Sequence, residues 1–245
     1  MNPAPCVLVT GAARRIGAAI ARGLHARGAR VMIHYCHAAE PAHALVAELN
    51  AVRPDSADWH AADLRDTAQL EALAETAWSR WGRLDGVVHN ASTFYPTAVG
   101  ATTLAQWDDL MGTNLRAPYF LTQALAPALR ASGGSVVNLV DIHAIQPLKD
   151  HPVYCAAKAG LVMLTRSLAR ELAPEVRVNA VAPGAILWPE RPMSTEVRER
   201  IVERIALKRS GMPEDIARTV AFLLLDAPYI TGQVLAVDGG RSLGY

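Results

Sequence analysis

The sequence predicts one α/β domain, built on a doubly wound parallel sheet of about seven strands with helices on both faces. Short runs of β-branched and other apolar residues alternate with longer amphipathic stretches along the 245-residue chain, and this alternation is typical of βαβ units. No stretch rich in proline, glycine and serine interrupts the pattern, so we expect a single domain over residues 1–245. A glycine-containing turn follows the first run, where open α/β sheets bind nucleotides.

Seven short runs are expected to form the strands, because most of them are dense in Val, Ile and Leu and are bounded by turn or helix signals. They cover residues 6–10, 30–35, 57–60, 84–89, 135–140, 176–181 and 233–237. The stretches between them have helical spacing, so right-handed crossovers are expected throughout.

The helices are expected over residues 15–27, 41–50, 67–81, 104–130, 153–172 and 213–225. Gly28 and Gly82 are expected to end the first and third of them, since glycine favours the C-terminal end of a helix. Pro118 is expected to kink or divide the 104–130 stretch, and Pro127 to end it early. Residues 183–200 contain three prolines and are predicted to form a loop with some helix, within a substrate loop at about 185–210.

Composition and charge exclude several classes of protein. The net charge is +1, so no basic field indicates a nucleic-acid or membrane partner. Three cysteines are too few for a disulfide framework, and their spacing matches no zinc pattern, so no metal site is expected. The first residues do not have the pattern of a secretory signal, and no run of ~18 apolar residues occurs. We therefore expect a cytoplasmic protein whose partner is a small molecule.

The turn after the first strand has the composition of a phosphate-binding loop. Glycine lets the backbone approach a pyrophosphate, which the N-terminus of the following helix also favours. Gly11 and Gly17 are present, but Arg15 stands where the usual three-glycine fingerprint has its middle glycine. The alternative is an ordinary strand-to-helix turn.

The end of the second strand indicates NADP rather than NAD. A site for NAD places Asp or Glu there to bind the ribose hydroxyls, whereas residues 34–37 read His-Tyr-Cys-His. Because this strand end has no carboxylate, nothing there would repel a 2′-phosphate. The nearby Arg14 and Arg15 would attract one. We therefore expect NADPH as the cofactor.

Tyr154 and Lys158 lie four residues apart on a predicted helix, so both side chains share one face. A cation beside a phenol lowers the pKa of the tyrosine, which makes it a usable proton donor near neutral pH. The helix follows the fifth predicted strand, so its N-terminus is expected at the carboxyl edge of the sheet, where ligands bind. The alternative is a surface tyrosine and a surface lysine without a catalytic role.

In the order and spacing of its motifs, the chain resembles the short-chain dehydrogenase/reductase family over nearly its whole length. The matching elements are Thr10-Gly11…Gly17, Asp63-Leu64, Asn90-Ala91-Ser92, Asn114, Tyr154-x-x-x-Lys158, Asn179-x-Val-x-Pro183-Gly184 and Asp238-Gly239-Gly240. The resemblance implies a seven-stranded Rossmann fold, a nicotinamide cofactor, and a homotetramer formed through the helices that include residues 104–130 and 153–172. It also implies that Tyr154 is the catalytic acid, that Lys158 lowers its pKa and holds the nicotinamide ribose, and that Asn114 helps a water relay.

The resemblance also assigns a set of residues to the cofactor, with Asp63 beside the adenine. They are Gly11, Arg14, Arg15, Ile16, Gly17, His34, Tyr35, His37, Asp63, Leu64, Asn90, Ala91, Ser92, Tyr154, Lys158, Pro183, Gly184 and Ile186.

At three positions the chain departs from the family pattern, and its residues there resemble those of pteridine reductases, a branch of the family. Asp141 stands where the family has serine, the segment after the fourth strand reads His89-Asn90-Ala91-Ser92, and Arg15 replaces a glycine. Shorter matches are Leu24-His25, His34-Tyr35, Gln146-Pro147-Leu148 and Trp188-Pro189-Glu190. In that branch an aromatic residue stacks on the pterin, an Asp pairs with the Tyr, and an Arg at the glycine turn touches both cofactor and substrate.

The residues that match those roles are Phe94, Asp141 and Arg15, and His37-Ala38 stands where the branch often carries Arg-Ser for the 2′-phosphate. The catalytic set is thus Asp141, Tyr154, Lys158 and Asn114. The substrate-binding set is Arg15, Ser92, Phe94, Asp141, Tyr154, Leu187 and Trp188.

The identity of these residues has its own physical meaning. Stacking between an aromatic ring and the nicotinamide would place a flat pterin over the hydride donor. Reduction of a C=N bond needs a proton at nitrogen, which an Asp–Tyr pair can supply, whereas a ketone needs only a neutral donor to oxygen. The alternatives are that Asp141 caps a loop, that Phe94 packs in the core and that Trp188 only packs. We expect His143 and His151, which flank the loop, to take no part.

Three hypotheses for the function follow. The first is an NADPH-dependent pteridine reductase that takes dihydropterins, including dihydrofolate, to the tetrahydro form. The second is a short-chain reductase of a carbonyl substrate such as a 3-oxoacyl thioester, which Asp141 and Phe94 disfavour. The third is a redox-sensing module that binds NADP without turnover, which the intact Tyr154 and Lys158 disfavour.

Overall fold

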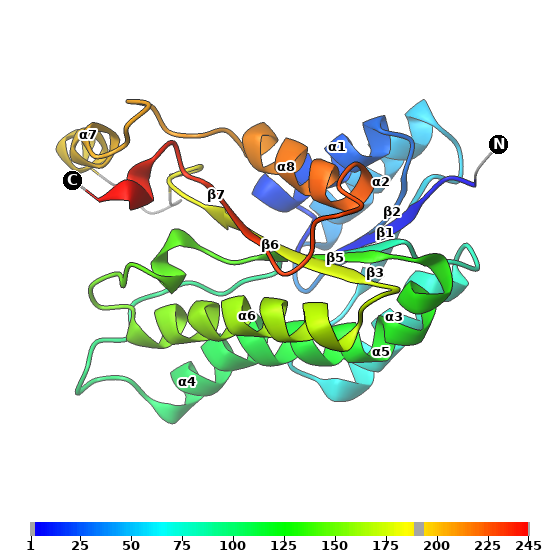
Figure 1. Ribbon diagram of the computed structural model, residues 1–245, viewed down its shortest axis with the longest axis horizontal. Helices are drawn as coiled ribbons and strands as arrows, with labels where there is room; N and C mark the ends of the chain where they lie inside the picture. The colour runs from blue at the N-terminus through cyan, green and yellow to red at the C-terminus, as the bar shows by residue number, and fades with distance from the viewer. Residues whose placement is uncertain (1–2, 189–193, 245) are drawn as a thin grey trace.

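A seven-stranded parallel sheet forms the centre of the computed structural model, which describes residues 3–188 and 194–244 (Figure 1). The strand order is β3-β2-β1-β4-β5-β6-β7, which is the order of a doubly wound fold with its reversal between β1 and β4. The strands are β1 (Cys6–Val9), β2 (Arg30–Tyr35), β3 (Ala57–Ala61), β4 (Gly86–His89), β5 (Ser135–Leu139), β6 (Arg177–Pro183) and β7 (Val234–Val237). The predicted fold class is confirmed.

Helices cover both faces of the sheet, with α1, α2 and α8 above it and α3 to α6 below it in Figure 1. The helices are α1 (Arg15–Ala26), α2 (Ala39–Val52), α3 (Thr67–Ser79), α4 (Leu104–Met111), α5 (Ala117–Ser132), α6 (Pro152–Glu171), α7 (Thr195–Glu203) and α8 (Pro213–Leu225). Because both faces are covered, the central strands are apolar along their whole length rather than in alternation. Leu8 and Val9 are fully buried although they point to opposite faces.

The long stretch after β4 is divided beside Pro118, as expected, by a π-helical turn over Gly112–Arg116, and Pro118 lies in the first turn of α5. Proline has no N–H to donate back into this turn, so regular helical hydrogen bonding is interrupted beside it. The expectation for Pro127 is wrong, because α5 continues past it to Ser132 and stops at Gly133, which has a φ of 65°.

Other helix and strand ends shift by a few residues. The helix expected to end at Gly82 ends at Ser79, and the strand expected from Leu84 begins at Gly86. Beyond β6, the predicted loop with some helix contains α7, while the Pro189-Glu190 pair lies outside the described residues. Within the described part of the chain, no helix has the length and apolarity needed to cross a membrane.

Candidate active site

Two glycines in the turn between β1 and α1 cannot carry a side chain without displacing their neighbours. A Cβ on Gly17 would lie 2.4 Å from the carbonyl oxygen of Gly11, and a Cβ on Gly11 would lie 2.8 Å from the Cα of Ala91. Gly11 and Arg15 both have left-handed backbone, with φ of 60° and 55°. Left-handed backbone costs a non-glycine residue roughly 1–2 kcal/mol, so Arg15 stands in a strained position at the start of α1, as residues at functional sites often do.

A cleft of about 510 Å³ opens against this turn, at the carboxyl ends of the central strands. Of the predicted cofactor residues, it is lined by Gly11, Arg14, Arg15, Ile16, Gly17, His34, His37, Asp63, Leu64, Asn90, Ala91 and Ser92. It is also lined by Cys36, Ala62, Arg65, Thr93, Asp109 and Thr113. A helix N-terminus beside two arginines makes this end of the cleft attractive to phosphate groups.

The side chains of His34 and Tyr35, which were predicted to contact the cofactor, form hydrogen bonds with other parts of the protein. The His34 ring is buried and bonds at 3.1 Å to the backbone N–H of Gly11 through Nδ1 and at 3.0 Å to the carbonyl of Ala62 through Nε2. Burial lowers its pKa to about 4, so it stays neutral and braces the glycine turn. The Tyr35 hydroxyl bonds to His43 at 3.2 Å, and its ring packs near that of Trp59.

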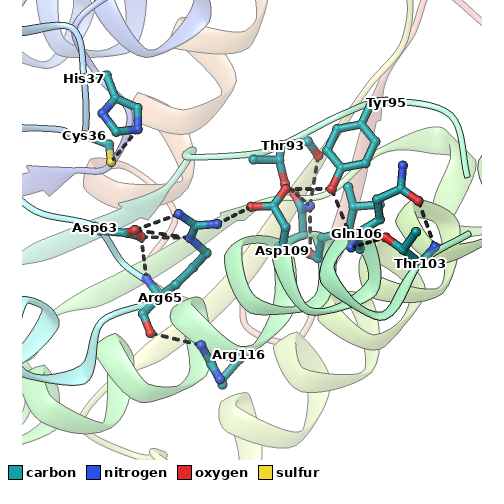
Figure 2. A network of polar contacts seen from close by, with 12 residues as sticks. Cys36, His37, Asp63, Arg65, Thr93, Tyr95, Thr103, Gln106, Asp109 and Arg116 are labelled. Carbon is teal, nitrogen blue, oxygen red and sulfur yellow. Dashed lines mark hydrogen bonds and ion pairs between the residues drawn. The ribbon is translucent and has the colours of Figure 1, made fainter.

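The far end of the cleft brings His37 and Asp63 into one region, as Figure 2 shows. His37 Nε2 lies 3.4 Å from the sulfur of Cys36. Asp63 is paired with Arg65 at 2.8 Å, and this arginine holds the pKa of Asp63 down at about 2. His37 is thus an imidazole at the place predicted for the 2′-phosphate, and Asp63 is a fully ionised acceptor next to it.

A second, smaller cleft of about 190 Å³ continues from the first and is lined by three of the four predicted catalytic residues, Asp141, Tyr154 and Lys158, but not by Asn114. Arg15, Ile16, Asn90 and Ser92 line both clefts. The rest of the lining is Leu139, Val140, Asp141, Tyr154, Lys158, Pro183, Gly184, Ile186 and Leu187. These residues come from the ends of β5 and β6 and from the first turns of α6, so the sheet edge gathers them.

Asp141 uses its two carboxylate oxygens for different purposes. Oδ1 accepts the backbone N–H of His143 at 2.8 Å and caps the short 3₁₀ turn Ile142–Ala144. Oδ2 accepts the hydroxyl of Tyr154 at 2.8 Å. The loop cap and the pairing with tyrosine were alternatives in sequence, and the structure contains both.

The pKa of Tyr154 moves opposite to the expectation. Burial and the Asp141 carboxylate, which accepts the hydroxyl hydrogen bond, raise it well above the usual value for tyrosine. The Lys158 ammonium lies 5.7 Å from the centre of the Tyr154 ring and donates at 2.9 Å to the carbonyl of Leu139. Burial lowers the pKa of Lys158 to about 8. Tyr154 is therefore a protonated donor, and Lys158 does not turn it into a phenolate in this state.

Asn114 lies in the π-helical turn that interrupts the α4–α5 stretch. Its Oδ1 accepts the Ser92 hydroxyl at 2.6 Å, and its Nδ2 donates at 3.0 Å to the carbonyls of Thr93 and Leu110. Asn114 is fully buried. These bonds connect it to the loop that follows β4.

Phe94 borders the catalytic residues with an aromatic face. Its side chain is 44% exposed, and its ring meets that of Tyr154 edge-on, with centroids 4.8 Å apart. On another side it stacks on His151 at 4.7 Å, with the ring planes 12° apart. His151 was expected to be a bystander, but it supports the ring that we predict to bind substrate, and its Nδ1 bonds to the carbonyl of Lys149 at 2.8 Å.

The loop after β6 closes the other side of the small cleft. Ile186 is buried, and Leu187 is partly exposed. Trp188 offers its backbone carbonyl to Arg15 at 3.2 Å, while the Arg198 guanidinium lies 5.6 Å from the centre of its ring. Arg15 therefore links the glycine turn to the predicted substrate loop.

Several residues of the site were not predicted from the sequence. Arg65 directly follows the matched pair Asp63-Leu64, so its closeness to the cleft could have been inferred. Asp109 on α4 and His151 directly before α6 are half-buried polar residues that belong to no motif, and only the packing of α4 and α6 against the loop after β4 brings them here. No local pattern would have identified them.

Comparison with known proteins finds one matching family model and relatives with two different activities. A family model described as "Enoyl-(Acyl carrier protein) reductase" matches residues 11–242. "Pteridine reductase 1" of Leishmania tarentolae is 38% identical over 98% of this chain and 97% of its own length. The "3-oxoacyl-[acyl-carrier-protein] reductase FabG" of Staphylococcus aureus strain Mu50 is also 38% identical, over 98% of this chain and 99% of its own.

A further relative of the second kind is the reductase of the same name from Staphylococcus epidermidis strain ATCC 12228, which is 37% identical over 95% of this chain and 97% of its own. The identities do not separate the two activities. The model and the relatives each cover almost the whole chain, and the sheet order and the Tyr154–Lys158 pair agree with them. The chain belongs to the short-chain dehydrogenase/reductase family of oxidoreductases.

Proposed function

We propose that the protein is an NADPH-dependent pteridine reductase that converts 7,8-dihydropterins of the biopterin or monapterin type to tetrahydropterins, with dihydrofolate and oxidised pterins as further substrates. One observation carries this proposal, namely the 2.8 Å hydrogen bond between Tyr154 and Asp141 beside the exposed ring of Phe94. A carboxylate in contact with the proton donor suits chemistry at nitrogen, and an aromatic ring in contact with that donor suits a flat heterocycle.

The larger cleft supports NADPH as the cofactor. A Cβ at Gly11 or Gly17 would meet Ala91 or the Gly11 carbonyl, so the two glycines keep the turn tight at the N-terminus of α1, where a pyrophosphate would bind. Arg14, Arg15 and His37 line the same cleft, and they are the cationic or protonatable groups that would hold a 2′-phosphate. Asp63 is the acceptor for the adenine end.

The reaction needs a hydride and a proton. NADPH held in the larger cleft, against the glycine turn and Arg14, would supply a hydride to the carbon of a C=N bond in the pterin ring. Tyr154 keeps its proton at neutral pH because burial and Asp141 raise its pKa, so it releases the proton only when the neighbouring ring nitrogen becomes strongly basic. Lys158, buried and paired with the carbonyl of Leu139, offsets the negative charge that then remains on the tyrosine oxygen.

Reduction of a 3-oxoacyl thioester is the second candidate, favoured by relatives of that name at equal identity. The test is NADPH oxidation measured in parallel with dihydrobiopterin, dihydromonapterin, dihydrofolate and an acetoacetyl thioester. The proposal predicts that a dihydropterin has the highest kcat/KM. A faster thioester would establish the second candidate, and failure of every substrate would favour binding without turnover.

We also propose that the protein acts in the cytoplasm as a homotetramer that buries faces of α4, α5 and α6. Large apolar side chains are exposed on these helices at Trp107, Tyr119, Phe120 and Met163, and exposed apolar patches often mark protein interfaces. Sedimentation velocity would give the mass, and a monomer would contradict this part of the proposal.

A further inference from the structure

A chain of polar side chains connects the adenine subsite, which is the end of the larger cleft at Asp63, to the Phe94 loop, which is residues 93–99. Figure 2 shows its members in order, from Asp63 at the end of β3 through Arg65 to Asp109 on α4 and then to Tyr95. Each step is a short contact, since Arg65 lies 2.8 Å from both carboxylates and the Tyr95 hydroxyl donates to Asp109 at 2.8 Å. Segments about 45 residues apart in sequence are joined in this way.

Arg65 uses its planar guanidinium as a fork between two acids. Nε and Nη2 donate to the two oxygens of Asp63 at 3.0 and 2.8 Å, and Nη1 donates to Asp109 at 2.8 Å. The carbonyl of Arg65 accepts a hydrogen bond from Arg116, on the π-helical turn, at 3.0 Å. Because the fork is rigid, its position on Asp63 sets its position on Asp109.

Tyr95 connects the far end of this chain to the catalytic region. Its hydroxyl also reaches the carbonyl of Gln106 at 3.2 Å, and burial together with the Asp109 bond raises its pKa to about 12, so the donor proton is retained. Its ring packs against the cluster that contains Val153 and Tyr154. Phe94 is the preceding residue, so the place of Tyr95 limits where the Phe94 ring can lie.

We infer that Arg65 and the Tyr95 hydroxyl are positioning residues that couple occupation of the adenine subsite to the order of the Phe94 loop. This inference rests on the proposed cofactor site and is independent of which substrate is reduced. Neither residue takes part in the chemistry.

The coupling has a physical cause in side-chain order. The Arg65 side chain is 43% exposed, and an isolated exposed ion pair stabilises little because ordering two side chains opposes it. An adenine held at Asp63 would immobilise the Asp63–Arg65 pair. The remaining bonds from Arg65 to Asp109 and from Asp109 to Tyr95 then form with less loss of conformational entropy. The Phe94 loop is therefore more ordered when the adenine subsite is filled.

The test uses the adenosine half of the cofactor, which lacks the nicotinamide, and the readout leaves out Thr93, which lines the larger cleft. Adenosine 2′,5′-bisphosphate and ADP are added in separate arms to the full-length protein, and amide hydrogen exchange is followed in residues 94–99 and in residues 11–17. The backbone N–H of Thr97, bonded to the carbonyl of Asp150 at 2.7 Å, reports on the loop. We expect the nucleotide that binds to slow exchange of the loop about threefold or more.

Tyr95→Phe removes only the hydroxyl, and Arg65→Met removes the fork, and both should abolish this protection of the loop while residues 11–17 stay protected. Arg80→Met is the matched control, because Arg80 also joins two aspartates. Its partners, Asp55 and Asp58, lie at the amino-terminal end of β3, away from the cleft. This control should keep the full effect. The inference would be overturned if the nucleotide protected the loop equally in the wild type and in all three variants. It would also be overturned if residues 11–17 of the wild type were protected and the loop was not. Failure of the pterin proposal shows separately, as absent dihydropterin turnover.

Discussion

At the scale of single residues, the proton donor depends on the contact between Tyr154 and Asp141. The carboxylate and the buried environment keep the phenol protonated, so the hydroxyl is the proton source in the proposed reaction. Tyr154→Phe should lower kcat by about 10²–10⁴, the usual range for a lost general acid. Because the ring remains, NADPH affinity measured by fluorescence titration should change little. Near-normal turnover would mean that another group, with Asp141 as the first candidate, supplies the proton.

Burial of the Lys158 ammonium lowers the stability of the folded protein. The pKa of a lysine in the unfolded chain is about 10.5, whereas burial lowers the pKa of Lys158 in the folded protein to about 8. Between these pH values the unfolded chain binds more protons, so this group makes stability rise with pH. Below pH 8 the buried charge therefore costs about 3 kcal/mol, while removal of the amine would leave the Leu139 carbonyl without its donor at a cost of about 1 kcal/mol.

We therefore expect Lys158→Met to be more stable than the wild type at pH 7 by about 2 kcal/mol, although it should lose most of its activity. Denaturant unfolding at pH 7, 8, 9 and 10 measures the difference, which should shrink as the pH rises. A variant less stable than the wild type at pH 7 would show that Lys158 contributes favourable interactions beyond its bond to the Leu139 carbonyl.

At the scale of elements, the β1–α1 turn is where sequence and geometry agree most closely. Gly17→Ala puts a Cβ 2.4 Å from the Gly11 carbonyl oxygen and 2.6 Å from the Asn90 amide, so the turn must shift. NADPH affinity should fall about tenfold or more, since the phosphate-binding backbone moves. Gly23→Ala, in the same helix, meets only the Cβ of Ala217 at 3.4 Å.

The Gly23 variant is the matched control for this change. It should keep its NADPH affinity and gain about 0.5–1 kcal/mol in stability, because alanine is the better helix former. Isothermal titration calorimetry and denaturant unfolding give both quantities. Similar NADPH affinities in the two variants would show that the turn tolerates a side chain and that its glycines have another purpose.

Most elements could be predicted from the sequence, because buried parallel strands and amphipathic helices differ in length and pattern. The π-helical turn could not, because Gly112–Arg116 lies within one continuous helical pattern, and Pro118 indicated a break beside it without indicating its type. The predicted Tyr154–Lys158 pair lies in one cleft, but the direction of the Tyr154 pKa shift was wrong. Burial and a carboxylate outweigh the lysine, and side-chain burial is set by tertiary packing.

At the scale of the whole molecule, the sheet brings the ends of β1, β4, β5 and β6 to one edge, so the two clefts adjoin and share Arg15, Ile16, Asn90 and Ser92. This architecture is common to the family and does not select a substrate. Selection depends on the few side chains that differ at the small cleft. Among them, Asp141 is the one in contact with the proton donor.

The most direct test of the proposed reaction is therefore the kcat for dihydrobiopterin in the wild type and in Asp141→Ser, with NADPH saturating. Loss of the bond to Tyr154 should lower kcat by about tenfold or more with a smaller change in KM, because the interaction belongs to the transition state. Cofactor affinity, measured alongside, should be retained. Unchanged dihydrobiopterin turnover in Asp141→Ser would reduce Asp141 to a loop cap and contradict the account.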